Sequence, residues 1–250
     1  MPVKFEFNSA EITEIKGLLR VSPIFQENGL RVERFGGVPF VYPEATGKET
    51  LFISRDALGN LIKNLNAPYE KACFLVGDSK ESATSLTECF PIIDNAAKRS
   101  SCNLFISQDA YLLQLERIKS EIGLHNSITI VDVHSHPSTI DMLLDADSWQ
   151  RRNFLETVPL GDILRTDKNL QLGYGPRHPD EFSQGDEMHA LYTAQIARKL
   201  QFSRYLFGIV RFYDLIEGDA EKRFARLLIC EQQAVIKTKL IDFAIVNKQE

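Results

Sequence analysis

The chain has 250 residues, of which 44% are hydrophobic and 25% charged, as expected for a globular protein with a substantial core. This length favours one large domain, or one domain with a modest appendage. The formal net charge of -5 disfavours a phosphate-backbone partner, so no nucleic acid is expected to bind.

Targeting signals are not evident in the sequence. No apolar run is long enough to span a bilayer, and the first residues lack the apolar core of a signal peptide, so no membrane partner is expected. The four cysteines contain no CxxC pair and are interpreted as reduced thiols: Cys73, Cys89, Cys102 and Cys230. We therefore predict a cytoplasmic protein, although secretion without a cleaved signal would leave no mark in the sequence.

The predicted organisation is an N-terminal extension over residues 1–47, followed by a main domain over residues 48–250. An insertion rich in glycine, proline and charge interrupts the main domain at about residues 155–190. In the main domain the pattern predicts a strand at 51–53, a helix capped by Ser54, a buried strand at 72–76 that closes at Gly77, and a paired strand at 84–93.

The second half of the chain continues the alternation of strands and helices. Ser107 is expected to cap a helix, and residues 127–133 are β-branched and apolar, as in a central strand buried on both faces. Further on, the pattern predicts helices at 144–156 and 188–200 and a strand at 205–212. Beyond Gly218 we expect a long helix, with a strand at 226–230 as the alternative. The alternation indicates an α/β fold.

Two histidines at the end of the central strand point to a metal. His134 and His136 are two residues apart, so their imidazoles lie on the same side of the strand and can converge on one ion. Zinc takes few nitrogen and oxygen ligands and keeps an open position when it is catalytic. Asp147, eleven residues past His136, is the preferred third ligand, with Asp145 and Asp141 as competitors. The alternative is a pair of ordinary polar residues at a strand end.

Glu70 is the candidate general base. It immediately precedes the buried strand that begins near Ala72, which is an unusual place for a charged side chain. It could be an ordinary solvated glutamate in the preceding loop. In the functional interpretation it lies over a metal-activated water and accepts its proton.

These segments together resemble the JAMM (MPN-plus) zinc metallopeptidases, which include deubiquitinases. The family pattern places a glutamate before an apolar strand ending in glycine, then His-Ser/Thr-His followed by proline, and then Ser-x-x-Asp. The resemblance covers roughly residues 50–150 and is weak over 150–200. The matching segments are Glu70 to Gly77, Phe90 to Asn95, Leu104 to Asp109, His134-Ser135-His136-Pro137, and Asp147.

The resemblance implies an MPN/JAMM (cytidine-deaminase-like) core, in which helices flank a central sheet, with one Zn²⁺ per chain. It implies a peptidase or isopeptidase that cleaves after the C-terminal tail of ubiquitin or a ubiquitin-like protein, and it leaves open a complex with other proteins. The family serine that helps stabilise the oxyanion is Leu144 here. Ser135 and Leu144 are the candidate substrate-contacting positions.

Two other functions compete with this one. A metal-binding MPN module with weak or no activity would explain Leu144, whereas an enzyme that acts on a sulfur-carrier protein would keep the same metal chemistry. His178 and His189 are expected to be exposed histidines and not a second zinc site, because no cysteine accompanies them.

Overall fold

The computed structural model describes residues 30–45, 47–48, 50–80, 82–93, 98–100, 103–123, 127–137, 184–217, 220–234 and 237–247. In this part of the chain, no helix is both long enough and apolar enough to cross a membrane. Asp141, Leu144, Asp145, Asp147, His178 and the predicted helix at 144–156 lie outside the described residues.

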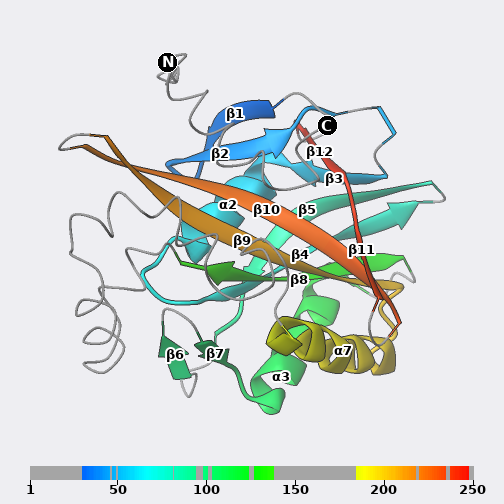
Figure 1. Ribbon diagram of the computed structural model, residues 1–250. Coiled ribbons are helices and arrows are strands. Elements are labelled where there is room, and N and C mark those ends of the chain that lie inside the picture. The colour runs from blue at the N-terminus through cyan, green and yellow to red at the C-terminus, as the bar shows by residue number, and fades with distance from the viewer. Residues whose placement is uncertain are drawn as a thin grey trace.

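A large mixed sheet dominates the fold (Figure 1). Its strands are β1 (Leu30–Phe35), β2 (Val38–Pro43), β3 (Leu51–Ser54), β4 (Ala72–Lys80), β5 (Ala83–Pro91), β8 (Ile128–His136), β9 (Arg204–Glu217), β10 (Ala220–Ala234), β11 (Lys237–Leu240) and β12 (Phe243–Val246). Across the sheet the order is β1-β2-β10-β9-β8-β4-β5-β3-β12, and β11 pairs with β10. A separate hairpin is formed by β6 (Lys98–Ser100) and β7 (Asn103–Phe105).

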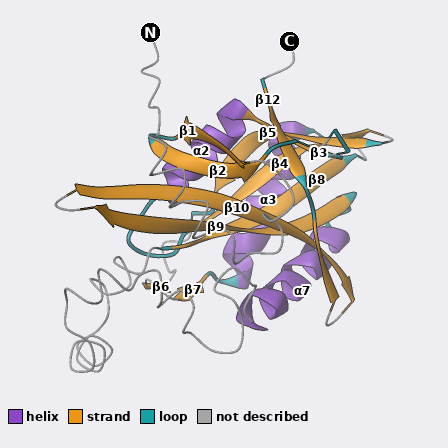
Figure 2. Cartoon of the chain, turned by 45° about the horizontal axis from the view of Figure 1, so that its top comes forward, coloured by secondary structure: helices purple, strands orange, loops and turns teal. Residues whose placement is uncertain are grey.

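Helices cover both faces of this sheet, as Figure 2 shows. The core on one face packs against α2 (Arg55–Leu65), through residues such as Leu58, Leu61 and Val133. The core on the opposite face packs against α3 (Gln108–Ile122) and α7 (Gln184–Lys199), through residues such as Leu115 and Ile196. The expected α/β class is therefore confirmed at the level of a mixed sheet with flanking helices.

The predicted helix caps are confirmed. Ser54 accepts a hydrogen bond from the amide of Ala57 at 3.2 Å, and Ser107 accepts one from the amide of Ala110 at 3.3 Å. Each cap satisfies a backbone donor that the first helical turn cannot. The predicted strands at 51–53, 72–76, 84–93 and 205–212 correspond to β3, β4, β5 and β9, and the helix predicted at 188–200 corresponds to α7.

Gly77 is required by close packing between β4 and β5. A β-carbon at this position would lie 1.8 Å from the carbonyl oxygen of Ser85, and the register of the two strands shifts between Val76 and Gly77. This irregularity explains why an apolar strand run closes on a glycine in the sequence.

The long helix expected beyond Gly218 is wrong. The segment is β10, which pairs along most of its length with β9 in an antiparallel ladder. Its Ala, Glu, Lys, Arg, Leu and Gln residues favour a helix locally, but Phe224 to Cys230 are buried between neighbouring strands. Tertiary pairing therefore overrides intrinsic propensity, and the strand alternative at 226–230 is the correct one.

The two regions that were predicted to lie outside the main domain both include elements of the main fold. The region expected to be an N-terminal extension includes β1 and β2, and β2 joins the large sheet through β10. The region expected to be an insertion at about 155–190 includes the start of α7 at Gln184.

Candidate metal centre

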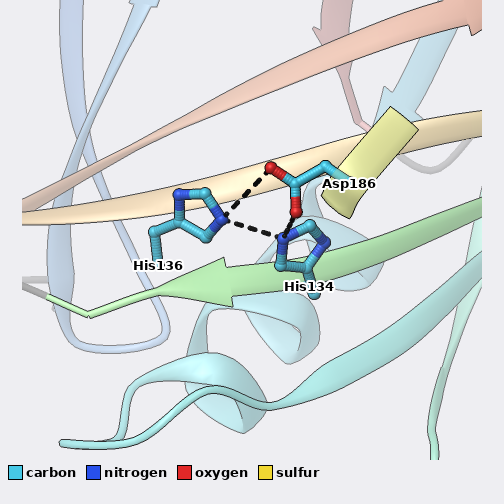
Figure 3. A group of neighbouring side chains, drawn as sticks. All are labelled: His134, His136 and Asp186. Carbon is cyan, nitrogen blue, oxygen red and sulfur yellow. Dashed lines mark hydrogen bonds and ion pairs between the residues drawn. The ribbon is translucent and has the colours of Figure 1, made fainter. Parts of the chain in front are cut away.

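The end of β8 presents both predicted histidines on one face of the sheet. β8 lies centrally, antiparallel to β4 and parallel to β9, and residues 128–135 are buried. Because side chains alternate along a strand, His134 and His136 point to the same side. Their Nε2 atoms are 2.9 Å apart (Figure 3). The sequence-based prediction that the two imidazoles converge is confirmed.

Helix α7 places a carboxylate directly against these two nitrogens. Asp186 lies in its first turn, and its carboxylate oxygens are 3.1 Å from Nε2 of His134 and 3.9 Å from Nε2 of His136 (Figure 3). An acidic side chain is favoured in the first turn of a helix by the partial positive charge of the unpaired amides there. Sequence reasoning did not identify Asp186.

The three donor atoms suit a divalent transition metal. All lie within 4.8 Å of one another, and the two shortest separations, 2.9 and 3.1 Å, are near the tetrahedral edge of about 3.3 Å set by zinc–ligand bonds near 2.05 Å. Two imidazoles and one carboxylate are a donor set typical of zinc with an open position. Among the described residues, His134, His136 and Asp186 form the single such group. Asp147 and Asp145 are not described, so their ligand roles remain predictions.

Burial and proximity set the charges in this group. Burial lowers the pKa of His136 to about 4, so at neutral pH its imidazole is neutral and can bind a metal. Burial also acts to lower the pKa of His134, but Asp186, together with Glu70 and Asp132, outweighs it and raises that pKa. Burial opposes ionisation of Asp186, yet its hydrogen bonds with His134 and His136 hold its pKa well below the usual range.

Glu70 lies beside this group and is buried. Ala72 pairs with His134 in the β4–β8 register, and the amide of Ser135 donates to the carbonyl of Lys71 at 2.8 Å. Continuing that register places Glu70 opposite His136, on the same side of the sheet as the two histidines. Burial raises the pKa of Glu70 to about 7, with His134 and Asp186 close enough to interact electrostatically. The interpretation as a solvated loop glutamate does not fit a side chain that is 9% exposed.

Ser135 points to the opposite face of β8 from the two histidines. It is fully buried, and its hydroxyl accepts a hydrogen bond from the amide of Lys71 at 2.9 Å. The Ser135 side chain therefore links Lys71, the residue after Glu70, to β8, the strand that carries His134 and His136. Leu144, the other candidate substrate-contacting residue, lies outside the described residues.

His189 is not simply an exposed histidine, as the sequence had suggested. Its Nε2 lies 3.2 Å from Oδ2 of Asp132 and 2.8 Å from the hydroxyl of Tyr111. The sequence contained one usable signal: Asp186 and His189 are three residues apart, a spacing that puts both on one side of a helix. The signal was missed because this helix was expected to start at residue 188, after Asp186.

Neither a scan of the chain against models of known protein families nor a comparison with curated protein sequences found a match.

Proposed function

We propose that this protein is a zinc-dependent hydrolase of amide bonds, with the metal held by His134, His136 and Asp186. The observation that carries the proposal is the position of Glu70, a buried carboxylate beside a group of metal-binding donors, with a pKa of about 7. A group with this pKa can both accept and release a proton near neutral pH, as general acid–base catalysis requires.

The chemistry divides between the metal and Glu70. Zinc held by His134, His136 and Asp186 would supply Lewis acidity, which would polarise the scissile carbonyl and lower the pKa of the attacking water toward neutrality. Glu70 takes the proton from the attacking water and later transfers it to the leaving amine. The C–N bond breaks, and a carboxylic acid and an amine are released. His136, neutral at this pH, and the ionised Asp186 provide ligand lone pairs without losing a proton first.

We further propose a JAMM-type peptidase that cleaves after the C-terminal tail of ubiquitin or a ubiquitin-like protein. The first support is the order of the motifs from Glu70 to His136. The second is that Glu70 precedes β4, whereas the two histidines lie in β8, the strand that pairs with β4. The substrate class comes from the sequence resemblance alone.

The direct test is cleavage of amides and isopeptides that follow ubiquitin-like tails, with zinc-loaded wild type and Glu70→Gln. The glutamine side chain nearly preserves the shape of the glutamate but cannot accept a proton, so turnover should fall by about 10²–10⁴ while zinc stays bound. Glu88→Gln on β5 makes the same chemical change at an exposed site and should cleave like wild type. Equal rates for Glu70→Gln and wild type would eliminate Glu70 as the base.

A metal-binding module with little activity is the second candidate, and the residue that favours it is Leu144, where the JAMM family has serine. It predicts tight zinc binding without cleavage of any ubiquitin-like tail. Release of an amino acid from a sulfur-carrier protein is a third activity of the same centre, and a sulfur-carrier conjugate in the same assay distinguishes it.

A further inference from the structure

Two neighbouring side-chain contacts join β8 to α7. His134 on the strand meets Asp186 on the helix at 3.1 Å, and Asp132 on the strand meets His189 on the helix at 3.2 Å. Asp132 and His134 are two residues apart and share a face of β8, whereas Asp186 and His189 are three apart and neighbours on the surface of α7. The Asp132–His189 contact therefore lies next to the His134–Asp186 contact, between the same strand and the same helix.

The Asp132 carboxylate is deeply buried, at 1% exposure, and is held by donors from other elements. Oδ2 accepts from the hydroxyl of Tyr205 on β9 at 3.1 Å and lies 3.2 Å from Nε2 of His189. Burial, with the charge of Asp132, raises the pKa of both Tyr111 and Tyr205, so both phenols keep their hydrogens and can donate. A histidine with its hydrogen on Nε2 can donate to Oδ2 of Asp132.

Thr193 extends these contacts by one more turn of α7. Its hydroxyl donates to the carbonyl of His189 at 2.9 Å and also contacts the hydroxyl of Tyr205. Tyr111 brings α3 to the same point, through its 2.8 Å contact with His189. Residues from β8, β9, α3 and α7 therefore meet at Asp132 and His189, directly beside the contact between His134 and Asp186.

We infer that Asp132 and His189 are positioning residues, which hold α7 in the register that presents Asp186 to His134 and His136. The inference depends on the metal centre of the proposed function, but not on the peptidase activity. A ligand must be held within about 0.5 Å of its binding geometry by supporting residues. Outer partners of metal ligands typically contribute about 10–100-fold in metal affinity. Here the support acts through the helix that carries the ligand.

A double-mutant cycle between His189 and Asp186 tests this inference. Zinc affinity is measured by chelator competition for wild type, His189→Leu, Asp186→Asn and the double variant. His189→Leu should weaken zinc binding by about 10–100-fold in the wild-type background. In the Asp186→Asn background it should have almost no further effect, because the ligand that it positions is already lost. His189→Gln, which keeps a donor toward Asp132, should recover part of the affinity.

The visible spectrum of the Co²⁺-loaded protein reports ligand geometry independently of turnover. It should change in His189→Leu and in the milder Tyr205→Phe. Thr129→Val is the matched control, because Thr129 is a buried residue of the same strand whose hydroxyl contacts Ser79 at 2.6 Å. This control should lower thermal stability without changing zinc affinity or the cobalt spectrum.

Several results would overturn the inference. Folded His189→Leu with wild-type zinc affinity, or losses that add fully in the double variant, would leave Asp132 and His189 as structural residues only. If His189→Leu does not fold, an unchanged cobalt spectrum and an unchanged zinc affinity in Tyr205→Phe would lead to the same conclusion. Absence of metal binding by wild type would remove the metal centre, and with it both proposals. Metal binding without cleavage would overturn the peptidase activity alone.

Discussion

The carboxylate of Asp186 lies 3.1 Å from Nε2 of His134, so a helix far along the chain completes a group that begins at the end of β8. A metal bound there would link α7 to the central strand of the sheet. Metal occupancy, the stability of the fold and the position of α7 are therefore coupled, because an ion that binds only the folded state stabilises it.

Removal of the metal should lower thermal stability. Zinc at about 100 times its dissociation constant adds about 2.7 kcal/mol to the free energy of unfolding. We expect one zinc per chain by elemental analysis, and a lower melting temperature after treatment with a chelator. The His134→Ala/His136→Ala double variant should contain no zinc and should not respond to the chelator. Identical zinc content in this variant and wild type would contradict the assigned centre.

Neutralising the third ligand should weaken metal binding, and the geometry assigns this position to Asp186. Asp186→Asn keeps the size of the side chain but removes the charge, so zinc affinity should fall at least about tenfold, as it can for changes even in outer-shell partners. Asp147→Asn and Asp145→Asn are the comparison variants, measured by the same chelator competition. Zinc loss in Asp147→Asn with retention in Asp186→Asn would assign the ligand to the position that the JAMM-like motif predicts.

Glu70→Gln should stabilise the metal-free protein in alkaline solution. Folding raises the pKa of Glu70 to about 7, so its contribution to stability is present below its unfolded pKa and is lost as pH rises through 7. Glutamine does not ionise, so it removes the destabilisation that the charged Glu70 causes at high pH, which is roughly 3 kcal/mol at most. Urea unfolding of the metal-free proteins should show the variant to be more stable at about pH 8, with little difference near pH 4. A stability difference that does not vary with pH would mean that Glu70 does not titrate as proposed.

Ser135→Ala should impair turnover without loss of metal. The hydroxyl of Ser135 accepts from the amide of Lys71 at 2.9 Å, one residue from Glu70. Its loss leaves a partly buried amide without that acceptor, which typically costs about 1–3 kcal/mol for a fully buried group and less here. We expect a lower melting temperature and a lower kcat, with unchanged zinc affinity. Thr129→Val, at the other end of β8, should lose stability but not kcat. An equal loss of kcat in both variants would indicate a general effect of destabilisation.

Leu144→Ser should increase the rate of a weak peptidase. A hydroxyl at this position can donate to the oxyanion as the scissile carbonyl becomes tetrahedral, and loss of one such donor typically costs about 10²–10³ in rate. Zinc shares that charge, so the gain should lie at or below the lower end of this range. Steady-state cleavage, together with a thermal melt, measures it. Unchanged turnover in a stable variant would mean that another group already supplies the donor. No cleavage by either protein would favour the metal-binding module.

The local pattern of the sequence determined much of the fold. Ser54 and Ser107 identified two helix starts, because a short hydroxyl side chain before an apolar-periodic run satisfies the first free amide. The alternation at the end of β8 placed His134 and His136 on one face without any structural information. Glu70 could be singled out because an acidic residue next to a buried strand needs a particular environment.

Only the tertiary structure could decide the partners that come from distant segments. Asp186 meets His134, and Asp132 meets His189, because the fold places α7 over one end of β8, and no local rule encodes that contact. The same reason explains β10, whose residues favour a helix in isolation but pair with β9 in the sheet. Local sequence specifies what each segment can form, whereas long-range pairing and burial select the form that each segment adopts.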